Sequence, residues 1–190
     1  MNKSLLTQAA WNIATQKNPM LSAVLKAKYY PDSSFWTSTA TGTKSIFWSS
    51  ILQVKKELSN NSALQIHSGN SSIWSAPWCP LWDNIHDHML LPVTQLPLPS
   101  TISDLWQINS QSWNANYIAN IFDDQDVQTI TQIPIVPSNQ NDILRWTPPR
   151  DGKCSTKNIY RHLSSQQLVQ LPQQGSRSIS HHANLILQRA

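Results

Sequence analysis

Prolines limit where this chain of 190 residues can be helical. A proline ring inside a helix removes one backbone hydrogen bond and clashes with the preceding turn. Pro77 and Pro80 interrupt a run from Trp74 to Trp82 that contains three tryptophans, and prolines at positions 92, 97 and 99 mark a linker. Irregular or extended structure is therefore expected through the middle of the chain, with helices mainly on either side.

Three stretches before residue 60 have apolar residues at three- and four-residue spacings, the pattern of an amphipathic helix. The first is expected to be capped by Ser4 and the third to begin near Ser45. The second begins at Asn18-Pro19, a capping residue followed by the ring that suits the first helical position. The faces predicted to be buried are Leu5, Leu6, Ala9, Ala10 and Ile13 in the first, Leu21, Val24, Leu25 and Tyr29 in the second, and Phe47, Ile51, Val54 and Leu58 in the third.

Two β-hairpins are expected further along. Alternation around Leu64 and Ile66, a turn at 68–70 and an extended run at 72–74 predict a Trp-rich hairpin. A strand over 142–147, a turn over 148–152 and a partner strand over 153–155 predict a second hairpin. Short helices are predicted from Trp113-Asn114 through Ile121 and over 124–130, and a longer one over 156–164.

The predicted fold class is therefore α+β, with a partly disordered Gln/Ser-rich tail. We divide the chain into a helical segment (1–60), the Trp-rich hairpin (61–89), a Pro-containing linker with short helices (90–141), a C-terminal hairpin with its helix (142–165) and the tail (166–190).

Charge is segregated along the chain. Residues 1–60 hold seven Lys or Arg against two acidic residues, and residues 143–190 hold seven against one. Residues 61–142 contain seven Asp and no Lys or Arg. Basic ends suit a polyanionic partner, although contact between the ends and the acidic middle is equally compatible with the pattern.

Two cysteines, Cys79 and Cys154, are too few for a disulfide framework and too isolated for a zinc site. No apolar run reaches the length of a membrane span, and the N-terminus lacks the apolar core of a signal peptide. An intracellular location, in the nucleus or the cytoplasm, and no membrane partner are expected.

Catalytic centres are incomplete in this sequence. Asp123 and Asp124 could pair around magnesium, but they follow Phe122 directly and fit a helix start better. His86-Asp87-His88 offers too few ligands for a metal site, and a solvated loop is the simpler interpretation. Four glycines and a single glutamate, Glu57, leave no phosphate loop, nucleophile elbow or carboxylate cluster. We therefore expect no enzyme activity, metal or cofactor.

Nucleic-acid binding has positive signals, because basic groups neutralise phosphates and aromatic rings stack on unpaired bases. The candidate residues are Lys26, Lys28, Arg145, Arg150, Lys153, Lys157 and Arg161. The competing interpretation is that the neighbouring rings are core and the charges ordinary surface. A further alternative is a protein-interaction surface formed by Trp74, Trp78 and Trp82.

Seven short motifs occur in an order that resembles the region after the polymerase domain of plant-type non-LTR retrotransposon reverse transcriptases. Residues 68–78 are similar to the hallmark Gly-Asn-Gly-x-x-Ile-x-x-Trp-x-x-Pro-Trp, although His67 and Ser71 stand where glycines would be expected, which could strain the turn. The other motifs lie at 24–36, 45–52, 113–122, 133–135, 142–146 and 152–160. The last resembles the opening of a zinc-binding module, in which Cys154 occupies a strand position.

The resemblance implies a fragment of a reverse transcriptase and ribonuclease H polyprotein. Its catalytic aspartates would lie before Met1 and its zinc ligands after Ala190, so no catalytic or metal residue carries over. The function expected is a non-catalytic piece with weak binding to RNA or DNA, and with other parts of the polyprotein as further partners. The alternative is an interaction module that the host has adopted, which would use the Trp74–Trp82 segment.

Overall fold

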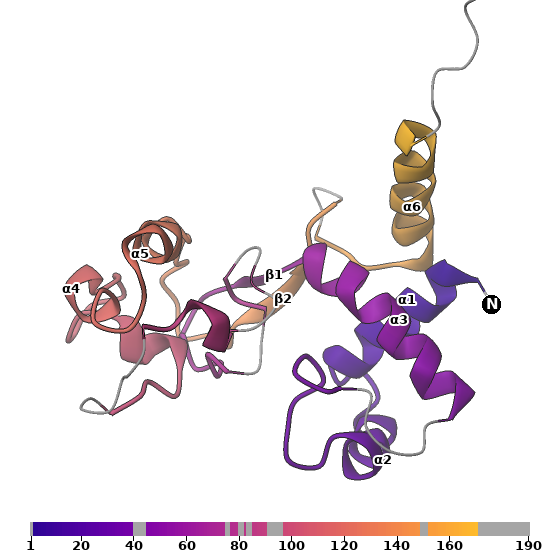
Figure 1. Cartoon of the computed structure of the whole chain (residues 1–190), viewed down its shortest axis with the longest axis horizontal. Helices are drawn as coiled ribbons and strands as arrows, with labels where there is room; N and C mark the ends of the chain where they lie inside the picture. Colours follow the sequence, from indigo (N-terminus) through magenta and orange to yellow (C-terminus); the bar gives the residue numbers. More distant parts are fainter. Residues whose placement is uncertain are drawn as a thin grey trace, which may run out of the picture.

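The computed structural model describes residues 2–39, 45–74, 77–79, 82, 85–90, 97–148 and 152–170, and only the backbone of 167–170. This part of the chain forms helices around one small antiparallel sheet, which confirms the α+β class (Figure 1). The α-helices are α1 (Lys3–Ala14), α2 (Pro19–Tyr29), α3 (Ile46–Asn60), α4 (Ala115–Ile118), α5 (Asp124–Thr131) and α6 (Thr156–Gln170). The strands are β1 (Ser62–Gln65) and β2 (Ile143–Trp146), and the 3-10 helices are η1 (Ile85–His88) and η2 (Ile102–Leu105).

Side-chain caps start the helices close to where the sequence predicts. Asn18 accepts a hydrogen bond from the Leu21 amide at 3.1 Å, and Ser45 accepts one from the Trp48 amide at 3.1 Å. These bonds satisfy amides that have no partner inside the helix. In α1 the cap is Asn2, whose side chain accepts from the Ser4 amide, so the expected cap at Ser4 is wrong.

The two strands pair with each other and not within separate hairpins. β1 and β2 run antiparallel, with Ser62 opposite Trp146 and Gln65 opposite Ile143. Ser72 forms its bridge with Thr101, and residues 152–155 are not a strand, so both expected hairpins and the strand position of Cys154 are wrong. β1 pairs with β2 instead of 72–74, Ser72 pairs with Thr101, and beside β2 the contact with the following segment is the hydrogen bond from the Trp146 amide to the Gly152 carbonyl at 3.2 Å.

A first hydrophobic cluster lies among α1, α2, α3, β2 and α6. Trp48 is 1% exposed and stacks between Tyr29 and Tyr30, at ring-centroid distances of 4.7 and 5.4 Å. Trp146 of β2 is fully buried and meets the ring of Trp11 edge-on at 6.3 Å. The core thus combines residues from the predicted segments 1–60 and 142–165. The division of the chain into five segments stays a prediction.

A second hydrophobic cluster collects the middle of the chain, from β1 to α5. Its fully buried members include Ile66, Ile102, Leu105, Ile118 and Ile130. The half-buried Leu144 of β2 packs against both clusters, so the sheet joins them. A groove of about 1780 Å³ runs between the clusters and is lined by residues of both.

Several predicted helix faces are shifted or shortened. Leu5, Leu21 and Val24 are 56%, 44% and 59% exposed; α2 buries Leu25, as predicted, together with Ser22, which was not predicted. In α3, Trp48 occupies the buried position expected for Phe47. The helix predicted through Ile121 is the single turn α4, capped by Asn114.

The tail predicted to be disordered from residue 166 begins inside a helix. Residues 166–170 belong to α6, which continues past the predicted end at residue 164. The remainder of that tail, including His181 and His182, lies outside the described residues.

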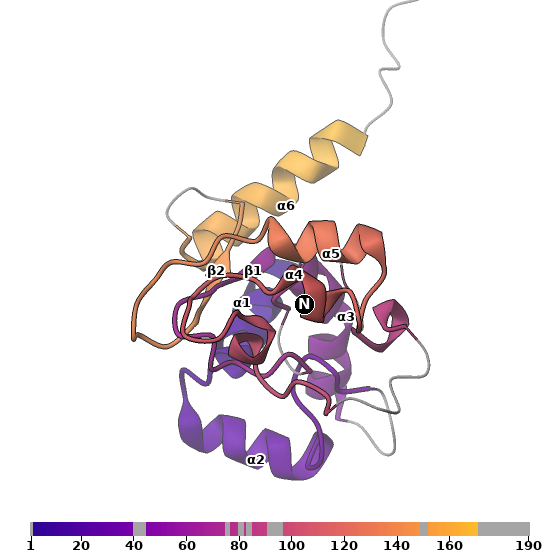
Figure 2. The same cartoon turned by 90° about the vertical axis from the view of Figure 1, so that its left-hand side faces the viewer.

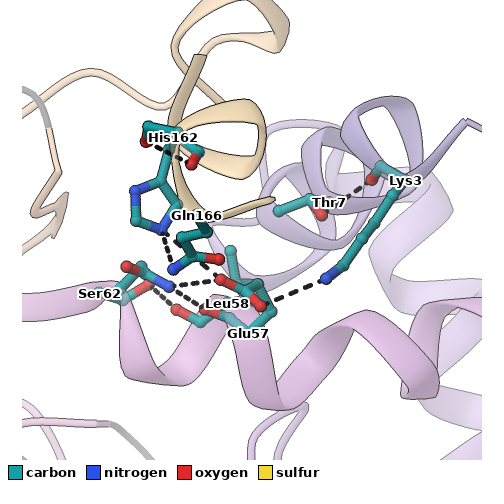
Figure 3. A network of polar contacts seen from close by, with 9 residues as sticks. Lys3, Thr7, Glu57, Leu58, Ser62, His162 and Gln166 are labelled. Atoms are coloured by element: carbon teal, nitrogen blue, oxygen red, sulfur yellow. Dashed lines mark hydrogen bonds and ion pairs between the residues drawn. The ribbon is translucent and has the colours of Figure 1, made fainter. Parts of the chain in front are cut away.

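The only glutamate, Glu57 of α3, connects three helices (Figure 3). One carboxylate oxygen lies 3.3 Å from Lys3 Nζ of α1, and the other lies 3.6 Å from His162 Nε2 of α6. The Asn61 amide also donates to Glu57, at 2.9 Å. Of these contacts, only the one with His162 joins α3 to α6, and both of its side chains are largely shielded from solvent.

Candidate nucleic-acid interface

Four of the predicted basic residues gather where β2 leads into α6, and we call this set the α6 surface: Arg145, Lys153, Lys157 and Arg161. All four are exposed. Arg145 packs beside Gly152, since a Cβ built there would lie 3.2 Å from Arg145 Cδ. The Lys153 carbonyl accepts from the Asn158 side chain at 3.0 Å, which places Lys153 at the start of α6.

The helix spacing places the last two cations together, because Lys157 and Arg161 are four residues apart on α6. No acidic residue occurs in α6. Among the described residues, the carboxylate of Glu57 contacts α6 at His162, whose ring also meets the buried Trp146. The α6 surface therefore presents positive charge to solvent, the electrostatic requirement for contact with phosphates.

The other predicted basic residues lie elsewhere. Lys26 and Lys28 are exposed in the last turn of α2, and α2 and α6 stand at opposite ends of the molecule in both views (Figures 1 and 2). Lys28 Nζ lies 5.3 Å from the centroid of the Tyr29 ring, and Lys26 lines the groove between the clusters. Arg150 lies outside the described residues. The structure thus separates the candidate set into two sites.

The groove carries a further positive charge that the sequence did not indicate. Lys55 Nζ donates to the carbonyl of Trp36 at 2.8 Å and to that of Ser38. Burial lowers the pKa of this ammonium. Its hydrogen bonds to the two carbonyls hold the 36–38 loop against α3, so Lys55 has a structural role in the groove wall.

The paired aspartates act as a helix start. Asp123 accepts from the Asp126 amide at 2.8 Å and so caps α5, as the sequence predicted. Asp126 is buried and bonds His88 Nδ1 at 3.0 Å, while the Trp82 ring stacks on His88 at 4.3 Å. Residues 86–88 belong to η1 and His88 is half-buried, so the expected solvated loop is wrong. His86 and Asp87 are exposed, and the His86 ring stacks on that of Trp74 at 5.2 Å. Within the described residues, no group of three or more His, Cys, Asp or Glu side chains could hold a metal ion.

The three tryptophans of the predicted protein-interaction surface differ in burial. Trp78 is 3% exposed and donates through its indole N–H to the Ile73 carbonyl at 2.9 Å. Trp74 and Trp82 are half-buried, and the Trp74 indole N–H donates to the Pro99 carbonyl at 2.9 Å. Trp78 belongs to the second cluster, Trp74 and Trp82 pack against it, and all three line the groove, so the protein-interaction surface stays a prediction.

Sequence reasoning missed Asp142, whose carboxylate accepts hydrogen bonds from three backbone amides. Its Oδ1 accepts from the amides of His67 at 2.7 Å and Gly69 at 2.9 Å, and its Oδ2 accepts from the amide of Ser71 at 2.9 Å. Burial raises the pKa of Asp142, but the hydrogen bonds to the charged form outweigh it and the net pKa is lowered. Asp142 therefore fastens the 67–71 turn to the start of β2.

That turn also corrects the expectation of strain at His67 and Ser71. Among residues 67–71, a positive φ occurs only at Gly69, where it is 67°. His67 is 6% exposed, and its two ring nitrogens have no hydrogen-bond partner among the described residues. The presence of histidine at position 67, where the motif would have glycine, thus leaves two ring nitrogens without hydrogen bonds but does not strain the backbone.

Both cysteines are shielded from solvent chemistry. Burial raises the pKa of Cys79 to about 12, with a further contribution from the negative charge of Asp126. Burial likewise raises the pKa of Cys154 to about 12. Cys79 is a small buried residue, as the sequence predicted.

We expect the folded protein to react with iodoacetamide at pH 8 about a thousandfold more slowly than a free thiol, because only the thiolate attacks. Both cysteines should react at the normal rate in concentrated urea. Mass spectrometry of the alkylated peptides measures each site separately. Rapid modification of either thiol in the folded chain would contradict its burial.

Comparisons of the chain with family models, with curated proteins and with solved structures find no match. Among the described residues, no helix is long and apolar enough to cross a membrane. The function must therefore be inferred from the residues and contacts of the chain itself.

Proposed function

We propose that this chain is a non-catalytic segment of a retrotransposon reverse transcriptase polyprotein that binds RNA or DNA weakly through the α6 surface. The observation that supports binding is the set of four exposed cations around the start of α6, a helix without acidic residues. The retroelement origin is supported by the order of the sequence motifs. In the intact polyprotein the segment would hold template or product beside the catalytic domains.

The α6 surface favours contact with the phosphate backbone over recognition of base sequence. Its members are lysines and arginines on a helix and a strand, and the neighbouring aromatic ring of Trp146 is fully buried. Tyr160 of α6 lies between Lys157 and Arg161 in sequence and is 61% exposed, so one ring is available for stacking, while the four cations would contribute most of the affinity through counterion release. Binding is therefore expected to be weak, tolerant of sequence and strongly dependent on salt.

Replacing Lys153, Lys157 and Arg161 together with glutamine tests this proposal. Each neutralised phosphate contributes a slope of about −0.7 to −0.9 in a plot of log K against log salt concentration. The triple variant should therefore lose about two units of slope and about two orders of magnitude of affinity near 0.1 M salt. Fluorescence anisotropy with labelled single-stranded RNA and duplex DNA measures both quantities.

A matched control removes the same number of charges elsewhere, by changing Lys17, Lys26 and Lys28 to glutamine. These lysines are exposed and lie in or beside α2, so the slope should stay close to that of the original chain. Equal effects of the two triple variants would show that binding depends on net charge alone. An affinity independent of salt would refute the proposal.

The retroelement origin has a separate test in the coding DNA on both sides of this reading frame. Polymerase aspartate motifs upstream and a Cys/His cluster downstream would support it. Flanking sequence unrelated to either would oppose it, without affecting the binding proposal.

A further inference from the structure

Helix α2 carries apolar side chains on the face that points away from the molecule. At 100° per residue, Met20, Val24 and Ala27 fall on one side of α2, opposite the buried Ser22 and Leu25. Met20 and Val24 are 81% and 59% exposed. Leu21, which borders this stripe, is 44% exposed. An amphipathic helix in a monomer normally buries its apolar stripe, so this one has the composition of an interface.

Positive charge accompanies the stripe. Lys28 lies beside it and Lys26 lies on the groove side of the same helix, and both are exposed. Helix α2 contains no acidic residue. We call Met20, Leu21, Val24 and Lys28, together with Lys26 at the groove-side edge of the helix, the α2 face.

A surface whose charge is complementary to that of the α2 face lies where η1 meets the start of α5. The Leu90 amide donates to the Ile121 carbonyl at 2.8 Å, and Met89 forms an isolated antiparallel β-bridge with Phe122. These contacts place η1 beside the start of α5. This contact brings together exposed carboxylates and one partly exposed leucine: Asp87, Leu90, Asp123 and Asp124. We call these residues the acidic patch. No Lys or Arg occurs anywhere from residue 61 to 142 to neutralise it.

We propose that the α2 face binds the acidic patch of a second copy of this chain. Apolar side chains flanked by lysines would meet a leucine flanked by aspartates. The contact would bury the apolar side chains and pair the lysines with the aspartates. In Figures 1 and 2, α2 and α5 lie far apart in both views, so one molecule cannot close this contact on itself. The pairing is head-to-tail, so it yields a ring if the rotation between successive copies closes and otherwise an open polymer that lengthens with protein concentration.

The composition of the chain favours such association. Ser, Asn and Gln account for 57 of the 190 residues, whereas charged residues make up 13%. Surfaces of this kind have little charge repulsion to keep copies apart. Little charge repulsion between copies therefore opposes the attraction between the α2 face and the acidic patch.

Charge reversal tests the pairing. One variant carries Lys26→Glu and Lys28→Glu, and the other carries Asp87→Lys and Asp124→Lys; Asp123 is left unchanged because it caps α5. Sedimentation velocity of the full chain should show concentration-dependent association that weakens as salt increases. Each variant alone should associate at least tenfold more weakly than the original chain. An equimolar mixture of the two should recover association, because reversed charges again face each other.

Two further variants separate this contact from general effects. Lys157→Glu with Arg161→Glu changes the net charge equally on α6 and should leave association unchanged. Met20→Ser with Val24→Ser keeps every charge and should weaken it. Circular dichroism checks that each variant remains folded.

The pairing is overturned if the original chain stays monomeric at all concentrations, or if the mixture of reversed variants stays as weak as its parts. Association that depends on neither α2 variant would also overturn it. A chain that remains monomeric but binds vesicles of anionic lipid through Met20 and Val24 would show that the α2 face meets a membrane surface instead.

Discussion

Asp142→Ala is expected to lower the free energy of unfolding by about 3 kcal/mol, because three backbone amides lose their acceptor at once. A net value of about 1 kcal/mol for each hydrogen bond gives this sum. The amides belong to the 67–71 turn, where His67 and Gly69 are buried, so water cannot fully replace the carboxylate. Urea unfolding followed by tryptophan fluorescence measures the loss.

Two comparison variants define what the carboxylate contributes. Asp142→Asn keeps one oxygen acceptor but loses the charge, so about half of the loss is expected. Asp32→Ala removes an exposed carboxylate and should change stability by less than about 0.5 kcal/mol. A loss in Asp142→Ala no larger than in Asp32→Ala would show that the turn does not depend on this residue.

The stability that Asp142 provides should depend on pH in a defined direction. Because the pKa of Asp142 is lowered in the folded state, its contribution is fully present above the ordinary carboxyl pKa. It is lost as the pH falls through the folded-state value. The difference in stability between the original chain and Asp142→Asn should therefore shrink in acid, and a difference that stays constant would contradict the charged contact.

Local features of this fold could be predicted from the sequence. Asn18, Ser45 and Asp123 cap their helices as expected because a cap depends on residues within one turn. Asn114 likewise begins a helix, although only a single turn follows. The grouping of Arg145, Lys153 and Lys157 could also be predicted, because these residues are close in sequence.

Contacts between distant segments could not be predicted. The alternation at Leu64 and Ile66 predicts a strand, but the identity of its partner depends on which distant segment reaches it. The same holds for Asp142, whose carboxylate oxygens accept hydrogen bonds from a turn more than 70 residues away in sequence. A lone aspartate before a strand gives no local signal of that role.

Side-chain periodicity was also insufficient to orient α2. The apolar pattern correctly placed Leu25 inside, but it also placed Leu21 and Val24 there, whereas packing against the rest of the first cluster exposes these two and buries Ser22. The face that a helix buries is set by its neighbours as well as by its own stripe. The separation of Lys26 and Lys28 from the α6 surface follows from the same placement of α2.

Gly69→Ala is expected to destabilise the protein by about 3 kcal/mol, for two separate reasons. The backbone of Gly69 has a φ of +67°, which costs a residue with a Cβ about 1 kcal/mol. The new Cβ would also lie 2.6 Å from Cζ2 of Trp106 and 2.9 Å from the backbone nitrogen of Ser103. Overlap with a ring and with backbone adds about 2 kcal/mol, because neither can move without disturbing the second cluster.

Gly152→Ala is the matched comparison, because Gly152 has nearly the same φ, +66°, but more room. Its nearest neighbour would be Cδ of Arg145 at 3.2 Å, part of a flexible exposed side chain that can shift. The expected loss is therefore only the conformational part, about 1 kcal/mol. Urea unfolding of the two variants under the same conditions yields the packing contribution as their difference. Equal losses would mean that Trp106 and η2 adjust freely around the turn, and that the close approach of Trp106 to Gly69 contributes nothing to stability.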